Sequence, residues 1–555
     1  MTVSDSPPTG DTTENLALPP ALIRKVSSDH LLRCVGEVYL QGEAEDTCTC
    51  KMKLTKALTE FQLGWPHMHY VFAVLCLFVV VYKLAVLFAK RKETLRNLEA
   101  FWGPPPHWLF GHVLELTVST HSQQLQKMIL PTGLLRVGLV RLICLPPTAF
   151  QVQSCLFCCF PHSCTCSSGN GLLVSEGQKW FRHRRLLTPG FHYVLKPYVK
   201  LMSESAQTML DKWESYASTN EPFELFKHVS LMTLDSIMKC AFSCYSNCQT
   251  EGGTNAYIKA VYELSFLIDL RLRMFPYHSD LIFHLSPHGF RYRKCQIYKC
   301  LHFIFFSKEE VIRKRREALR EEKELGQIQA KRYLDFLDIL LFARDENQQG
   351  LSDEDMRAEV DTFMFEGHDT TASGLSFILY CLACNPEHQK ICRKEIMEAL
   401  ETSWEDLSKI PYTTMCIKEA LRLYPPVPGI ARKTTKTVTF CDGRTVPAGS
   451  VVGISVYGIH RNASVWENPN VSKDNFIPKY CLVYFLHLIF SSLRNCIGQN
   501  FAMNEMKVVT ALTLKRYQLI AEPTMKPKII PRLVLRSLNG IHIKIKPLDA
   551  ETENK

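Results

Sequence analysis

The sequence predicts a mainly α-helical fold with small β-sheets, placed behind an N-terminal transmembrane helix. Three observations support this fold class. Long stretches, above all residues 352–385, repeat apolar side chains with the period of a helix. Short strand signals meet at a turn dipeptide, Asp442-Gly443. One run near residue 70 stays apolar for the length of a membrane span.

The composition limits the classes of function. The chain has 555 residues, of which 46% are hydrophobic, so it is long enough for a large core. Its net charge of +10 is spread along the sequence, which suits a membrane surface or an acidic partner protein better than a nucleic acid. No zinc-finger, homeodomain or RNA-binding signature occurs. The 22 cysteines are mostly scattered, and we interpret them as reduced thiols in a reducing compartment.

Three segments precede the main domain. Residues 1–67 form a polar extension rich in Ser, Thr, Pro and Glu, which we predict to be disordered. Residues 68–89 are almost continuously apolar and, at about 20 residues, can span a bilayer. The basic residues 90–92 follow at once and place the C-terminal side in the cytoplasm; a buried core helix is the alternative. Three prolines at 104–106 act as a stiff spacer, and the main domain covers residues 101–548.

Two segments early in the main domain carry notable side chains. Residues 144–170 contain six cysteines and His162, but their spacing matches no structural zinc pattern; a zinc-binding membrane adaptor is the alternative reading. Trp180 and Arg184 are four residues apart and share one face of a helix. An indole beside a guanidinium suits the binding of a carboxylate in a pocket, although a solvated basic face is the simpler interpretation.

A polar patch interrupts the apolar helix predicted over residues 352–385. Ser352 opens this helix through a capping box, and the proline that follows the segment ends it. In its middle, Glu366 and Thr370 are four residues apart and share a face, with Asp369 beside them. Acidic and hydroxyl groups inside an apolar helix are unfavourable unless they serve a function. The patch is therefore a candidate site.

Three smaller features complete the pattern. Gly367 lies in the same patch and lacks a side chain at a point where a flat group could approach. Glu419 and Arg422 are three residues apart and can form an ion pair, which alone is a weak signal. Residues 438–446 predict a hairpin, and the dipeptide at 539–540 predicts a second one.

The last motif places a cysteine before a buried helix. Residues 501–512 have an apolar helical period, and Cys496 lies at the N-terminal end of this segment. The helix dipole, free backbone N–H groups and Arg494 all favour a thiolate at this position. A thiolate so held suits axial ligation of a haem iron, and a small buried structural cysteine is the alternative.

In this order, the motifs resemble those of the cytochrome P450 haem-thiolate monooxygenases over residues 101–548. Residues 366–371 are similar to the motif of family 4, the fatty-acid ω-hydroxylases, and the sequence there and at 539–548 looks nearest to the 4B subfamily. The resemblance implies haem b, with Cys496 as the proximal iron ligand. It also implies that Asp369 and Thr370 deliver protons during oxygen activation, and that Glu366 can esterify a haem methyl group.

The same resemblance implies supporting residues and partners. Glu419 and Arg422 match the structural E-x-x-R pair. Four side chains match positions that hold the haem propionates: Trp180, Arg184, Arg432 and Arg494. Electrons are expected from NADPH through the cytochrome P450 reductase, with cytochrome b5 as a second partner. The expected location is the endoplasmic reticulum membrane with a cytosolic catalytic domain, and the expected substrate is a fatty acid or a small lipophilic xenobiotic.

One segment departs from the family pattern. The loop before the cysteine ligand reads F-x-x-G-x-R-x-C in the family, whereas residues 490–496 read Phe-Ser-Ser-Leu-Arg-Asn-Cys here. The glycine that allows a tight bulge below the thiolate is missing. An inactive paralogue or splice form that keeps the fold but binds haem poorly is therefore an alternative, which the sequence leaves open.

Overall fold

The computed structural model divides the chain into two compact units, residues 1–93 and residues 94–555, and each is described by itself. The residues that the structure describes are 69–86, 88, 89, 92, 96, 134–137, 140–144, 171–192, 195–245, 248–250, 255–295, 313, 317, 336–399, 407–440, 442–462, 466, 469 and 495–548. The extension predicted to be disordered, residues 1–67, lies outside them.

The N-terminal unit contains an apolar helix. Residues His69–Val86 are helical and have a mean hydropathy of 2.1, and none of them is buried. By length and composition this helix can cross a membrane. Its position agrees with the apolar run expected at 68–89, and the role of that run as a membrane anchor stays a prediction.

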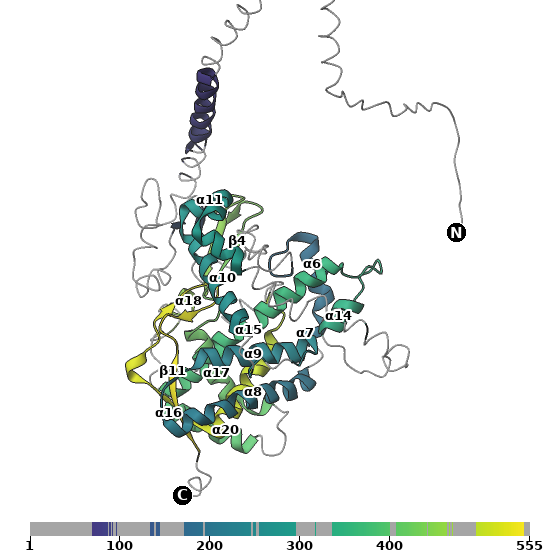
Figure 1. The fold of residues 1–555 in the computed structure, drawn as a ribbon, viewed down its shortest axis with the longest axis vertical. Helices are drawn as coiled ribbons and strands as arrows, with labels where there is room; N and C mark the ends of the chain where they lie inside the picture. The colour runs from purple at the N-terminus through teal and green to yellow at the C-terminus, as the bar shows by residue number, and fades with distance from the viewer. Residues whose placement is uncertain are drawn as a thin grey trace, which may run out of the picture. The chain divides into compact units, whose positions relative to one another are not determined.

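The larger unit is mainly helical, as the sequence predicts (Figure 1). Its α-helices are α6 (Gly177–Leu187), α7 (Pro189–His192), α8 (Leu195–Thr219), α9 (Leu225–Phe242), α10 (Asn255–Arg273), α11 (Asp280–Leu285), α14 (Phe336–Phe342), α15 (Asp353–Cys384), α16 (Pro386–Ala399), α17 (Pro411–Leu423), α18 (Val456–Ile459) and α20 (Gln499–Arg516). Short 3-10 helices are η2 (Phe275–His278), η4 (Leu407–Lys409) and η5 (Pro523–Met525).

The strands form four small sheets, in the orders β1-β2-β7-β4, β3-β11-β8, β5-β6 and β9-β10. Only β2 and β7 pair in parallel among the described strands. The bounds are β1 (Leu134–Val137), β2 (Val140–Cys144), β3 (Phe223–Glu224), β4 (Gly429–Lys433), β5 (Val438–Thr439), β6 (Thr445–Val446), β7 (Val451–Ser455), β8 (Tyr517–Ala521), β9 (Ile529–Ile530), β10 (Arg536–Ser537) and β11 (His542–Pro547).

One of the two predicted hairpins forms. Val438 pairs with Val446 across the β5–β6 turn, where Gly443 has a φ of 82°. The hairpin predicted at 539–540 is wrong, because the two strands that flank this turn enter different sheets: β10 pairs with β9, and β11 pairs with β8 and β3. Gly540 supports this turn with a φ of 77°, so the dipeptide marks a change of sheet rather than a hairpin.

The long helix α15 has the limits that the sequence predicts. The Ser352 side chain accepts a hydrogen bond from the Asp355 N–H, and the helix ends at Cys384. It packs against α9, beside which it lies in Figure 1, and against α17 and α20. The expectation that Gly367 faces a flat group is wrong: a Cβ there would lie 2.9 Å from Ile237 on α9, so the glycine permits close helix packing instead.

Two apolar clusters surround α15. One joins α8, α17, α20 and β11 to its C-terminal half. The other joins α6, α7, α9 and α14 to its N-terminal half, and it reaches α20 through Phe501. In this second cluster Phe363 stacks on Phe191 at 5.0 Å between ring centroids and lies 4.3 Å from Phe336. Phe501 follows Cys496 by five residues, so this cluster packs against the first turn of α20.

Candidate active site

Cys496 lies just before α20, whose N-terminal flanking residue is Gly498. The Cys496 side chain is exposed to solvent, yet enough protein atoms surround it for burial to raise the pKa of its thiol. The N–H of Gly498 acts in the opposite sense and lowers the Cys496 pKa by hydrogen bonding to the sulfur.

Helix α6 brings Arg184 beside this cysteine. The Arg184 guanidinium donates one hydrogen bond to the Asn495 carbonyl at 3.0 Å and another to the Asn495 side-chain oxygen. Burial lowers the pKa of Arg184, and the neighbouring Cys496 raises it. In return the Arg184 charge lowers the Cys496 pKa, so this arginine favours the thiolate.

Glu366 on α15 also lies near Cys496. Burial, assisted by the neighbouring carboxylate of Asp369, raises the pKa of Glu366 to about 7. The Glu366 carboxyl is close enough to Cys496 to raise the pKa of the thiol. Residues 184, 366 and 496, far apart in the sequence, therefore come together from α6, α15 and the segment before α20.

Asp369 and Thr370 take different directions from α15. The Thr370 hydroxyl donates to the Glu366 carbonyl at 2.7 Å. Asp369 is 2% exposed and forms an ion pair through Oδ1 with Arg536 on β10, which is 4% exposed. The Asp369 Oδ2 atom is buried and has no hydrogen-bond partner among the described residues. The Arg536 guanidinium also lies 4.0 Å from the ring centroid of Phe226.

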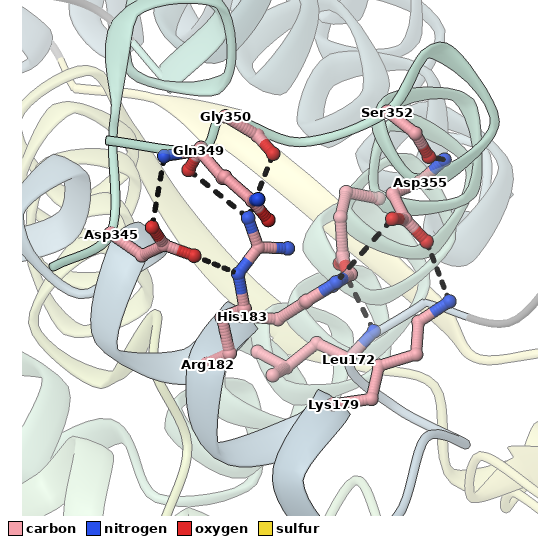
Figure 2. A network of polar contacts seen from close by, with 10 residues as sticks. Leu172, Lys179, Arg182, His183, Asp345, Gln349, Gly350, Ser352 and Asp355 are labelled. Carbon is pink, nitrogen blue, oxygen red and sulfur yellow. Dashed lines mark hydrogen bonds and ion pairs between the residues drawn. The ribbon is translucent and has the colours of Figure 1, made fainter. Parts of the chain in front are cut away.

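A polar network fixes α6 to the region around the start of α15 (Figure 2). His183 Nδ1 lies 2.6 Å from Glu359, and both side chains are at most 1% exposed. Glu359 also accepts a hydrogen bond from the Leu172 N–H at 3.0 Å. Lys179 pairs with Asp355 at 2.5 Å, as Figure 2 shows.

Arg182 extends this network to the loop before α15. Its guanidinium binds the Asp345 carboxylate at 2.6 Å and the carbonyls of Gln349 and Gly350 at 3.0 and 2.8 Å (Figure 2). The network holds in place the helix that carries Trp180 and Arg184. The alternative of a solvated basic face does not apply to Arg182 and Arg184, because both bind other parts of the chain.

The predicted pair of Glu419 and Arg422 is confirmed. Two hydrogen bonds of 2.8 and 2.6 Å join these side chains within α17, and both residues are buried. Arg422 also donates to the His460 carbonyl at 2.7 Å and lies 4.8 Å from the Trp466 ring centroid. The pair thus ties α17 to the segment after α18.

The remaining predicted residues occupy other places. Trp180 packs against the apolar cluster around the N-terminal half of α15. Arg432 is buried on β4 and donates to the Ala431 carbonyl at 3.0 Å. Arg494 lies outside the described residues, as do the altered loop at 490–494 and most of the cysteine-rich segment. Within the described part of the chain, no group of three His, Cys, Asp or Glu side chains is placed to hold a metal ion.

The side chains of Cys496 and Arg184 decide which group could bind here. Burial outweighs the backbone N–H of Gly498 and the nearby Arg184 and raises the Cys496 pKa in this structure, whereas a bound iron would hold the sulfur as a thiolate, a recognised axial ligand of haem iron. Arg184 offers a cation for the anionic edge of such a group. The residues present therefore fit a haem with a sulfur ligand, and the fold and site together place the chain in the haem-thiolate class.

Comparison with known proteins is more specific, and it shows that this chain belongs to the cytochrome P450 family, whose family model matches residues 102–545. The chain is 48% identical to cytochrome P450 4A7 of Oryctolagus cuniculus, with 86% of this chain and 96% of the relative aligned. It is 47% identical to cytochrome P450 4A11 of Homo sapiens (87% and 95% aligned) and 46% identical to cytochrome P450 4B1 of Rattus norvegicus (86% and 96%).

These findings confirm the predicted family, its family 4 branch and the mainly α fold. The chain is accordingly a haem monooxygenase, an oxidoreductase that uses O2. The identities to the 4A and 4B relatives are similar, and both subfamilies match nearly the whole length of the relatives.

Three residues of the site were missed by reasoning from the sequence. Arg536 lies 167 residues from Asp369, and His183 lies 176 residues from Glu359. One signal could have found Arg536: a buried carboxylate requires a cation, and residues 529–536 place two arginines in an apolar run. For His183 and Glu359 the sequence contains no comparable signal, because each has several oppositely charged candidates nearby in the chain.

Proposed function

We propose that this chain hydroxylates fatty acids at the ω-carbon, or oxidises small lipophilic xenobiotics, with O2 as the source of the inserted oxygen. The observation that carries the proposal is that Glu366 on α15 lies close enough to Cys496, just before α20, for its carboxyl to raise the pKa of the thiol. Relatives in both the 4A and 4B subfamilies support the family 4 chemistry.

Cys496 is proposed as the axial ligand of the haem iron, which when bound supplies the activation of O2. Arg184 and Trp180 are proposed to bind the haem propionates together with Arg432 and Arg494. Arg184 suits this role because it is fixed by Asn495 and stands next to the thiol. The fixed position keeps the guanidinium from having to reorganise when an anion binds.

Glu366 is proposed as the group that forms an ester with the haem. Its pKa near 7 leaves the carboxyl partly protonated at neutral pH, so it is a less stable anion than an ordinary surface glutamate. An ester between Glu366 and the haem would fix the orientation of the haem. It would also narrow the approach to the site, which favours reaction at the end of a chain.

Asp369 and Thr370 are proposed to handle protons. The Thr370 hydroxyl uses its hydrogen for the Glu366 carbonyl, so its oxygen can accept a hydrogen bond from a water. The Asp369 Oδ2 atom has no hydrogen-bond partner among the described residues, so it can accept a hydrogen bond from a water that carries a proton. Arg536 would hold the same carboxylate in place through Oδ1.

Electrons are proposed to come from NADPH through the cytochrome P450 reductase, with cytochrome b5 as a second donor. The net charge of +10 supports docking to acidic partners. The helix at 69–86 supports anchoring in the endoplasmic reticulum membrane, with the basic residues that follow it on the cytosolic side. The catalytic domain would then face the cytosol, as do its electron donors.

The experiment has two stages. The full chain is expressed, reduced and exposed to CO, and a thiolate-ligated haem is expected to give a red-shifted Soret band that Cys496→Ser abolishes. The protein is then supplied with NADPH, the reductase and dodecanoate, and ω-hydroxydodecanoate is the expected product. Folded protein without the band would contradict the proposal and favour the inactive form that the altered loop at 490–496 suggests.

A further inference from the structure

The connection between β9 and β10, residues 531–535, bridges two helices. At one end it is seated on α15, because the Ser373 hydroxyl donates to the Leu535 carbonyl at 2.7 Å. The Leu535 N–H donates to the Pro426 carbonyl at 2.8 Å. At the other end Leu533 packs against an apolar cluster built on α10 and α11. Ser373 follows Thr370 by three residues on α15. The Leu535 end of the loop therefore contacts α15 one helical turn from the proposed proton-handling residues.

Arg532 lies in this loop and is only partly exposed. Its guanidinium carbon is 4.9 Å from the ring centroid of Tyr262 and 5.2 Å from that of Phe266, both on α10. Its Nε and Nη1 atoms are buried and have no hydrogen-bond partner in the part of the chain that the structure describes. Two donors of a charged group are thus withdrawn from water and left unused, which is unfavourable unless a ligand completes them.

The acidic residues that could neutralise Arg532 are engaged elsewhere. Asp369 pairs with Arg536, whose guanidinium carbon lies 5.8 Å from the same Tyr262 ring. Glu263, next to Tyr262 on α10, pairs with Arg291. Among the described residues no carboxylate forms an ion pair with Arg532. Arg532 therefore carries a positive charge that no ion pair within the described residues neutralises, beside the rings of Tyr262 and Phe266.

We propose that Arg532 binds the carboxylate of an anionic, chain-like substrate and selects it over neutral compounds of the same length. The proposal rests on the proposed monooxygenase function. The buried Nε and Nη1 groups of Arg532 each offer an N–H donor for a charge-assisted hydrogen bond to a carboxylate, and Tyr262 and Phe266 provide apolar surface for the adjoining methylene groups. The carboxylate would be held at the loop while the far end of the chain reaches past Ser373 toward Thr370.

The experiment uses the full-length, haem-loaded protein and two probes that differ only in charge, dodecanoate and methyl dodecanoate. Equilibrium binding is measured by calorimetry, and turnover gives KM and kcat separately. For Arg532→Gln we expect the Kd and KM for dodecanoate to rise about tenfold or more, while kcat changes little. The values for methyl dodecanoate are expected to stay within about twofold, because the ester has no charge to lose.

Two further variants complete the design. Arg532→Lys keeps the charge and loses the planar guanidinium with its several N–H donors, so dodecanoate affinity is expected between that of the wild type and that of Arg532→Gln. Arg444→Gln is the matched control, since Arg444 pairs with Asp442 at the β5–β6 turn, and it is expected to change neither probe. The reduced CO spectrum of each variant reports whether the haem site is intact.

The outcomes separate this inference from the proposed function. A wild-type protein that binds both probes equally, or an Arg532→Gln variant that weakens both probes alike, overturns the assignment of Arg532 even if ω-hydroxylation is observed. A wild-type protein without the thiolate band, or without turnover, contradicts the proposed function instead. In that case the calorimetric preference for dodecanoate over its ester still decides the role of Arg532.

Discussion

The pair of His183 and Glu359 is expected to be worth several kcal/mol, because neither side chain can reach water. The two atoms are 2.6 Å apart, and the side chains are 1% and 0% exposed. His183→Ala leaves the Glu359 carboxylate with the Leu172 N–H as its remaining hydrogen bond among those described here. Removal of one partner of such a pair costs about 3–5 kcal/mol, because the other is left buried and uncompensated.

The same helix offers a matched control. Arg185 lies two residues after His183 and pairs with Glu346 at 2.5 Å, but these side chains are 47% and 80% exposed. Arg185→Ala is therefore expected to cost less than about 1 kcal/mol, since solvent screens an exposed ion pair. Urea unfolding of the full chain in detergent, followed by tryptophan fluorescence, compares the two variants.

A second measurement tests what the pair does for the site. Because α6 carries Trp180 and Arg184, loosening it should also speed the loss of haem to an excess of a haem-scavenging protein, which Arg185→Ala should not do. The double variant with Glu359→Ala then measures the coupling energy between the two side chains. Equal effects of the His183 and Arg185 variants, or a coupling energy near zero, would refute the reasoning.

Three other perturbations follow from the site. In haem-depleted protein, Glu366 binds a proton on folding, so stability falls by up to about 3 kcal/mol as pH rises from its ordinary pKa of 4.5 to its raised pKa of about 7. This slope should be missing in unfolding curves of Glu366→Gln, and equal slopes would contradict it. Thr370→Ala should keep NADPH oxidation while product formation falls; an unchanged ratio argues against a proton role. Arg536→Gln should lower the unfolding free energy by about 3 kcal/mol because Asp369 loses its cation, and a loss within experimental error would show that the pair is not stabilising.

Features fixed by neighbouring residues could be predicted from the sequence. The capping box at Ser352 and the proline after Asn385 set the limits of α15, and the structure confirms both ends. The pair of Glu419 and Arg422 depends on helical spacing alone and forms within α17. The sequence also indicated the candidate residues Cys496, Glu366 and Arg184. Their separation in the chain hides their proximity, but the family motifs that they match imply that they share one site.

Features that depend on distant partners could not be predicted. The hairpin expected at 539–540 fails because strand pairing is decided by the sheets that β10 and β11 enter, not by the turn between them. Gly367 has no side chain and therefore suggests an open position, yet Ile237 on α9 occupies the place where a side chain would lie. The local sequence shows that a residue is small or charged. The role of that property depends on the residue that packs against it in the fold.

The pairing of Asp369 explains how one carboxylate can be both fixed and available. If Asp369 used both oxygens for Arg536, it would be a structural anchor with nothing left to exchange. Because Arg536 engages Oδ1 while Oδ2 is buried with no hydrogen-bond partner in the described part of the chain, the cation supports the carboxylate and leaves one oxygen for a proton or a water. A buried acid without Arg536 would be unfavourable, and an acid fully paired to it would be inert, so the one-sided pair is the arrangement that a proton-handling role requires.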